Sequence, residues 1–264
     1  MINFAKIRMC HGALLGVPLL VGWASPAHAQ QKDENPAPNA DRIVVGIGAG
    51  ATPTYQGAGD YRILPIPAID IKQGWFFANL RNGIGIAPID NAQVTIGASA
   101  VFLQGYRKRD VPQGIDKLSD GVGARLFATI RAGGFVATVG GTKSVSGGTK
   151  GLIADASVSY PVRVSSRLTL TPTVGTTWAN GKYNDGYFGI TAAESLASGL
   201  PRFTAGSGFR DVSGSLTASY RLTDRLTMSV TGSATSLLGV VKDSSLVVHQ
   251  TQPSGFLTLS YRFR

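Results

Sequence analysis

Cysteine, histidine and methionine are scarce in this sequence of 264 residues, which holds one, three and three of them. The single cysteine, Cys10, stands within the first 29 residues together with His11 and His28. The rest of the chain therefore has no thiol, and His249 is its one imidazole. This inventory excludes a disulfide framework and a Cys/His zinc site there, and it predicts no metal and no cofactor.

The chain also has no apolar run of the length that a membrane-spanning helix needs. The N-terminal run "ALLGVPLLVGWA" (13–24) has 12 residues, against about 20 for a bilayer span. Lys6 and Arg8 precede it and "AHA" ends at Ala29, which predicts a signal peptide over 1–29 that is cleaved after Ala29. Residues 30–41 are polar and predict a disordered periplasmic leader, and 42–264 a single domain.

Acidic residues are fewer than basic ones, 15 against 25, and loss of Lys6 and Arg8 would lower the formal net charge from +10 to +8. For an exported protein, a basic balance favours anionic membrane lipid and lipopolysaccharide phosphates as neighbours over nucleic acid. "YRKRD" (106–110) is a candidate phosphate contact, with a solvated run of charge as the alternative.

What the sequence has in abundance is alternation with a period of two. Between Val212 and Ala234, apolar residues and glycine stand at even positions and serine or threonine at most odd ones, with a break at 223–225. The same pattern predicts about twelve strands, at 42–50, 61–72, 75–80, 83–89, 92–106, 121–132, 135–143, 151–162, 167–179, 211–222, 226–235 and 255–264. The strands at 75–80 and 83–89 are the weakest, and their merger would give ten.

Several of these strands have about ten residues or more, the length of a tilted transmembrane strand. Because lipid satisfies no backbone hydrogen bond, such strands must close into a barrel, with apolar side chains outside and polar ones inside. The connections alternate between short turns and the long segments 51–60, 107–120, 144–150, 180–210 and 239–254, except for the tight pair Arg81–Asn82. We therefore predict an all-β fold, an antiparallel transmembrane β-barrel that meanders up and down with short periplasmic turns and long outer loops.

Two interpretations of the lumen stay open. The candidate lumen-facing residues are Arg125, Arg131, Arg221, Arg262 and Asp155. A basic lumen would favour anions and predicts a narrow channel. Alternatively, the arginines pair with acids and fill the bore, as the size of such a barrel allows. In the long segment 180–210, "AAESLASGL" (192–200) favours a short helix, and whether that segment plugs the barrel is open.

The sequence has few residues suited to catalysis, and we predict that the protein is not an enzyme. His249 lies near Asp243, Ser244 and Ser245 in sequence, which leaves a lipid-modifying enzyme as one hypothesis and a solvated loop histidine as the simpler one. "GIGAG" (46–50) lacks the following helix of a dinucleotide site.

Several segments together resemble the MipA/OmpV family of outer-membrane proteins, named after an MltA-interacting protein. They are "TPTYQG" (52–57), "LPIPAIDIKQGWFFA" (64–78), "GYRKRD" (105–110) and the block "YNDGYFGITAAESLASGLPRFTAGSGFRDV" (183–212). The motif residues are Thr52, Pro53, Tyr55, Gly57, Tyr187, Phe188, Gly189, Ser198, Gly199 and Leu200, and Tyr261 and Phe263 in the closing "YRF" are the candidate assembly signal. The resemblance implies an outer-membrane barrel without catalytic residues. For the named member it also implies a scaffold that joins a murein lytic transglycosylase to a penicillin-binding murein synthase.

Overall fold

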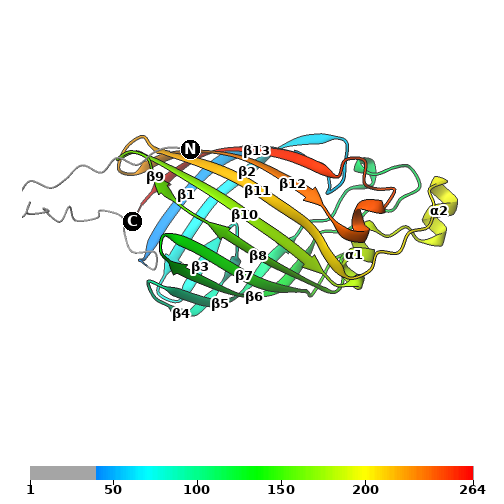
Figure 1. Cartoon of the computed structure of the whole chain (residues 1–264), viewed down its shortest axis with the longest axis horizontal. Helices are drawn as coiled ribbons and strands as arrows, with labels where there is room; N and C mark the ends of the chain where they lie inside the picture. Colours follow the sequence, from blue (N-terminus) through cyan, green and yellow to red (C-terminus); the bar gives the residue numbers. More distant parts are fainter. Residues whose placement is uncertain (1–39, 264) are drawn as a thin grey trace, which may run out of the picture. The chain divides into compact units, whose positions relative to one another are not determined.

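The computed structural model describes residues 40–263, and this part of the chain forms a closed antiparallel β-barrel (Figure 1). The strands are β1 (Arg42–Pro53), β2 (Tyr61–Gln73), β3 (Phe76–Asn79), β4 (Gly83–Asp90), β5 (Val94–Leu103), β6 (Gly121–Ala132), β7 (Phe135–Ser144), β8 (Leu152–Ser159), β9 (Val162–Arg163), β10 (Leu168–Ala179), β11 (Gly208–Arg221), β12 (Leu226–Leu237) and β13 (Thr251–Arg262). Each strand pairs with its neighbour in sequence, except that β8 and β9 both pair with β10, and β1 pairs with β13 to close the sheet. The predicted fold class is confirmed.

β8 and β9 are two parts of one wall strand, so the barrel wall has twelve strands. Ser159 pairs with Thr173 and Val162 with Leu170, which is one continuous register against β10. The ladder breaks between them because the Tyr160 N–H donates to the Pro172 carbonyl at 3.1 Å, but Pro172 has no N–H to return. The sequence prediction of one strand over 151–162 therefore describes this wall strand well.

The two faces of the wall separate apolar from polar side chains. On β6, Leu126 and Ile130 are exposed on the outside, whereas Arg125 and Thr129 are buried inside. Exposed apolar residues such as Ile47 and Val174 continue this belt around the barrel. An apolar outer belt over a polar interior is the arrangement that lipid requires of a barrel.

Long loops and short turns lie at opposite ends of the barrel. The helices α1 (Gly181–Phe188) and α2 (Ala192–Ser198) and the 3₁₀ helices η1 (Lys108–Asp110) and η2 (Gly239–Asp243) all belong to the long loops (Figure 1). None of the helices within residues 40–263 is long and apolar enough to cross a membrane. The segment that favoured a short helix contains α2, whereas α1 was not predicted.

Most strand boundaries differ from the sequence prediction by one to four residues, and two of these differences have a structural reason. The last strand begins at Thr251 instead of 255, because 251–254 pair with β12 although Gln252 and Pro253 interrupt the apolar pattern. The predicted strand at 75–80 shortens to the four residues of β3, which pair with β2 only at its end, from Asp70 to Gln73.

Candidate functional site

Near the outer loops, the wall has a β-bulge on β11. Thr177 pairs with Asp211 and Trp178 pairs with Phe209, so Arg210 is an extra residue without an opposite number on β10. A bulge changes the direction of a side chain by breaking the strict alternation of a strand. The consecutive residues Arg210 and Asp211 consequently both point inward, and each is at most 5% exposed.

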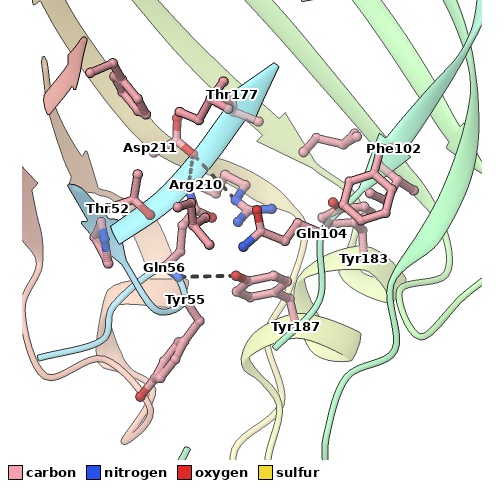
Figure 2. A pocket seen from close by; sticks show the side chains of 16 residues that line it. Thr52, Tyr55, Gln56, Phe102, Gln104, Thr177, Tyr183, Tyr187, Arg210 and Asp211 are labelled. Carbon is pink, nitrogen blue, oxygen red and sulfur yellow. Dashed lines mark hydrogen bonds and ion pairs between the residues drawn. The ribbon is translucent and has the colours of Figure 1, made fainter. Parts of the chain in front are cut away.

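Arg210 and Asp211 form a buried ion pair that has few hydrogen bonds. Arg210 Nε lies 3.5 Å from Asp211 Oδ2, is itself buried and has no hydrogen-bond partner. The guanidinium carbon lies 5.2 to 5.5 Å from the ring centres of Tyr183, Tyr187 and Phe188, within the range of cation–π attraction. Gln56 Nε2 donates to Asp211 Oδ2 at 3.4 Å (Figure 2).

Gln56, Tyr183, Tyr187, Arg210 and Asp211 line a cavity of about 560 Å³ in the outer half of the barrel. Its remaining walls are mostly apolar and include Leu64, Ile66, Phe102, Leu103, Ile153 and Phe256. Small-molecule sites commonly have ~300–1,000 Å³ and combine apolar walls with a few polar groups, as this cavity does. We call it the chamber.

The outer loops cover the chamber with a hydrophobic core of their own. Tyr55, Tyr106 and Tyr187 pack ring against ring, with centres 5.5 Å apart for both the Tyr55–Tyr106 and Tyr106–Tyr187 pairs. Ile115 and Leu246 complete this loop core, and each is at most 1% exposed. The Tyr55 hydroxyl donates to the Leu246 carbonyl at 2.9 Å, which ties the first outer loop to the last.

Burial also changes the acidity of these tyrosines. Desolvation raises the pKa of Tyr55 to about 12, and the neighbouring Tyr187 adds to the shift. Desolvation likewise raises the pKa values of Tyr106 and Tyr187 above their usual value. The loop core over the chamber is therefore held together by tyrosine side chains in their neutral form.

Below the chamber, charged side chains cross the lumen. Arg125 donates two hydrogen bonds to Asp155, at 2.5 and 2.9 Å, and a third to Thr142 at 3.2 Å. From the β3–β4 turn, Arg81 reaches Ser157 and Asn82 accepts a hydrogen bond from Arg125 at 3.4 Å. We call this set the crossing layer.

A second layer lies nearer the short turns. Arg42 pairs with Asp70 at 2.6 Å, and Lys72 pairs with Asp90. Arg131 donates to Thr95 at 2.9 Å. Among the candidate lumen residues, Arg125, Asp155 and Arg131 thus belong to these two layers. Arg221 and Arg262 instead end β11 and β13 at the short-turn rim, where the Arg221 guanidinium bonds to the Ser166 carbonyl.

The histidine hypothesis gains no support from the geometry. His249 is exposed, and its backbone N–H donates to the Gly57 carbonyl at 3.1 Å. Ser244 is buried and its hydroxyl donates to the Phe188 carbonyl at 2.7 Å, so this hydroxyl is engaged elsewhere. Within residues 40–263, no group of three His, Cys, Asp or Glu side chains is placed to hold a metal ion.

Comparison with known proteins gives the family. A family model described as "MltA-interacting protein MipA" matches residues 45–263. The chain belongs to the MipA family. It is also 23% identical over 241 residues to the "24 kDa outer membrane protein" of Pasteurella multocida (strain Pm70), covering 85% of this chain and 91% of that protein. The protein is thus an outer-membrane β-barrel.

Solved barrels with low sequence identity share the general architecture. The KdgM porin is 8% identical and superposes with a TM-score of 0.43, over 84% of this chain and 100% of the porin. An outer membrane channel from Pseudomonas putida F1 is 10% identical with a TM-score of 0.48, over 87% of this chain and 99% of the channel.

The MipA motif residues gather at the outer end of the barrel. Thr52, Pro53, Tyr55 and Tyr187 line the chamber, and Tyr55, Tyr187 and Phe188 belong to the loop core. The others shape loop backbone: Gly57 and Gly199 have positive φ, Gly189 caps α1, Ser198 ends α2 and Leu200 accepts a hydrogen bond from Ser195. At the other end, Tyr261 and Phe263 are exposed and pack edge to face, with ring centres 4.9 Å apart.

Arg210 and Asp211 were not predicted as site residues, although the sequence contains a signal for them. Continuing the alternation backwards from Val212 places Arg210 on the lipid-facing side, where a charged residue is costly. That conflict indicates a bulge.

Proposed function

We propose that this MipA-family protein is a non-enzymatic scaffold that holds a murein lytic transglycosylase, the MltA of the family name, at the periplasmic face of the outer membrane. A penicillin-binding murein synthase is the second proposed partner. The observation that carries the proposal is the family match over 45–263, because the family is described by its interaction with MltA. The partner contact would lie at the short-turn rim, since short turns face the periplasm in such barrels.

The short-turn rim carries a concentration of positive charge on one side. Five arginines lie at the ends of β9 to β13 or in the turns between these strands, and all but Arg221 are exposed. They are Arg163, Arg167, Arg221, Arg225 and Arg262. Backbone hydrogen bonds hold the turns together, from Arg221 N to the Arg167 carbonyl at 2.8 Å and from Arg262 N to the Arg225 carbonyl at 2.7 Å. A row of guanidinium groups on ordered turns suits carboxylates or phosphates on a partner surface.

Side-chain contacts across the lumen favour a scaffold over a channel. The loop core, the crossing layer and the layer around Arg131 all lie along the path that an ion would take. We expect purified barrel in planar bilayers to give no steady conductance. Steady single-channel steps would favour the channel function instead.

Direct binding tests the scaffold. Purified MltA-type transglycosylase from the same bacterium would be passed over immobilised barrel in nanodiscs at increasing salt. We expect retention that falls about tenfold for an Arg167→Glu/Arg225→Glu variant, in line with the ~1.5–3 kcal/mol of hydrogen bonds to charged groups. A matched variant of the outer loop, Arg107→Glu/Lys108→Glu, should bind as the unaltered barrel does. Absence of binding to the unaltered barrel contradicts the scaffold.

A further inference from the structure

At one place in the barrel wall, β2 and β5 each lack a strand partner on one side over part of their length. β2 has 13 residues, but β3 has four and pairs only with Asp70 to Gln73 of β2. Tyr61–Ile69 consequently have β1 as their one strand neighbour within residues 40–263. On the other side, β4 pairs with β5 no further than Ala100, so 101–103 have β6 alone as a strand neighbour in the same part of the chain. We call the space between these two edges, above the β3–β4 hairpin, the side opening.

The backbone of β2 is adapted to an edge. Thr54 N donates to the Asp60 carbonyl at 3.0 Å, which sets the ladder so that even-numbered residues of β2 bond to β1 and odd-numbered ones face the side opening. Pro65 and Pro67 are two of these odd residues, and neither has an N–H. Proline on an edge, with its nitrogen toward the unpaired side, removes donors that lipid cannot satisfy.

The chamber lies directly behind the side opening. Its lining includes Leu64 and Ile66 from β2 and Phe102 and Leu103 from β5, which are the two edges themselves. Phe102 is 68% exposed, so its ring stands between lipid and chamber. The loop core above and the crossing layer below flank the chamber along the barrel axis. The side opening is therefore the route into the chamber that the wall leaves free.

A second cavity, of about 470 Å³, continues from the same place toward the outer loops. It shares Leu64, Phe102 and Gln104 with the chamber, and its outer part is lined by Arg107, Lys108 and Lys117 among others. An amphiphile that moves from the outer surface into the wall would thus meet positive charge first and apolar side chains next.

Arg210 supplies the polar end of the chamber. The Arg210 side chain lines the chamber, and its buried Nε has no hydrogen-bond partner within residues 40–263, so a turn of the guanidinium group would let it donate to an acceptor that enters the chamber. Asp211 lies 3.5 Å away and opposes a second negative charge, but Gln56 also donates to it and shares that charge. A carboxylate is the acceptor that a guanidinium group binds best, through two parallel hydrogen bonds.

We propose that the chamber binds a single-chain carboxylic acid, which enters from the membrane through the side opening between β2 and β5. The hydrocarbon chain lies against Leu64, Ile66 and Phe102, and the carboxylate accepts hydrogen bonds from Arg210. This binding is independent of the scaffold function, because it uses the outer half of the barrel and no residue of the short-turn rim.

Photolabelling tests the proposal on the full barrel in phosphatidylcholine nanodiscs, with a diazirine-bearing hexadecanoic acid as the probe. We expect labelled peptides from 61–69 and 101–104, and competition by unlabelled hexadecanoic acid. The methyl ester of that acid should compete about tenfold less well, since it cannot form charge-assisted hydrogen bonds with Arg210. Labelling spread over outward-facing residues around the barrel, or equal competition by acid and ester, would overturn the proposal.

Two variants on adjacent residues make the test independent of the buried charges. Leu64→Trp places a large ring in the chamber wall at the side opening and should abolish the competed labelling. Ile63→Trp adds the same ring on the lipid-facing side, where Ile63 is 79% exposed, and should leave labelling unchanged. Heat-dependent migration in gels checks that both variants are folded. Equal labelling of both folded variants would also overturn the proposal.

Discussion

Arg125 on β6 reaches across β7 to bind Asp155 on β8 through two hydrogen bonds, of 2.5 and 2.9 Å. The pair joins strands that are not neighbours, and it does so in a lumen where Arg125 is only 6% exposed. A bidentate pair of this kind fixes both side chains and ties β6 to β8 inside the lumen.

Removing one partner of this pair should destabilise the barrel. Arg125→Met leaves Asp155 without its partner, and breaking a buried pair costs ~3–5 kcal/mol. Because the Asp155 side chain is 32% exposed, we expect a loss toward the lower end of that range. Urea unfolding in lipid vesicles, followed by tryptophan fluorescence, measures it. The double variant Arg125→Met/Asp155→Asn should recover part of the lost stability. A double variant with a lower free energy of unfolding than Arg125→Met would contradict this explanation.

Gly140 on β7 provides the passage for Arg125. A Cβ at this glycine would lie 2.3 Å from an Arg125 Nη atom, whereas a Cβ at Gly141 would have no atom within 4 Å. We expect Gly140→Ala to destabilise by ~1–3 kcal/mol, as overpacking does, and Gly141→Ala to change little. The same unfolding experiment compares them, and equal effects of the two variants would show that Arg125 does not need this passage.

The alternation of residues was sufficient to predict the strands of the wall. The segment 121–132 was predicted with the bounds that β6 has, because its inward and outward residues alternate without interruption. Alternation reports which face a residue occupies, and that property is local to one strand. The short β3 and the side opening depend on how far the β3–β4 hairpin extends along β2 and β5. The residue pattern of a single strand contains no information about that length.

The chamber could not be predicted for a similar reason. Arg210 reaches the interior through one extra residue in β11 relative to β10, so its position is a property of the pair of strands. Tyr55, Tyr106 and Tyr187 come from three different loops, and their ring contacts form only when the barrel brings those loops together. The family resemblance did include Tyr55 and Tyr187 as motif residues, without indicating what they do.

The neutral tyrosines of the loop core predict a loss of stability at high pH. A tyrosine has a usual pKa near 10, and the pKa of Tyr55 is raised to about 12. Between these values the folded protein keeps a proton that the unfolded chain has lost. Stability therefore falls as pH rises from 10 toward 12. Urea midpoints across this range should decline, and Tyr55→Phe should reduce the decline. A near-ultraviolet titration in which all tyrosines of the folded barrel ionise near pH 10 would contradict it.

The cap of α2 predicts a local response at its N-terminus. The Thr191 hydroxyl accepts from the Glu194 N–H at 3.2 Å, and the Glu194 carboxylate accepts from the Thr191 N–H at 2.9 Å. Thr191→Ala should lower the local opening free energy of α2 by ~0.5–2 kcal/mol, and Thr191→Ser should change it little. Hydrogen exchange of the α2 amides measures both, and equal exchange in the two variants would contradict a capping role.

Acid should weaken the same helix. Partial burial raises the pKa of Glu194, but hydrogen bonds from Thr191 and from the Asp116 N–H outweigh it, so the pKa lies below its usual value of 4.5. The stabilisation is present above that value and is lost as pH falls through the lowered pKa. Exchange of α2 amides, corrected for intrinsic rates, should accelerate in this range, and Glu194→Gln should remove the pH dependence. A pH dependence that persists in the glutamine variant would assign it to another group.

The prolines at the side opening give the sharpest test of an open edge. Pro65→Val/Pro67→Val adds two N–H groups that face lipid, and each unsatisfied group costs several kcal/mol there. We expect either a lower urea midpoint or pairing of β2 edges between two copies, which crosslinking would detect. Pro172→Val is the matched control, because its new N–H would meet the Tyr160 carbonyl and extend the β8–β10 ladder. If the double variant is as stable as the unaltered barrel and monomeric, the β2 edge is covered and the side opening does not exist in the membrane.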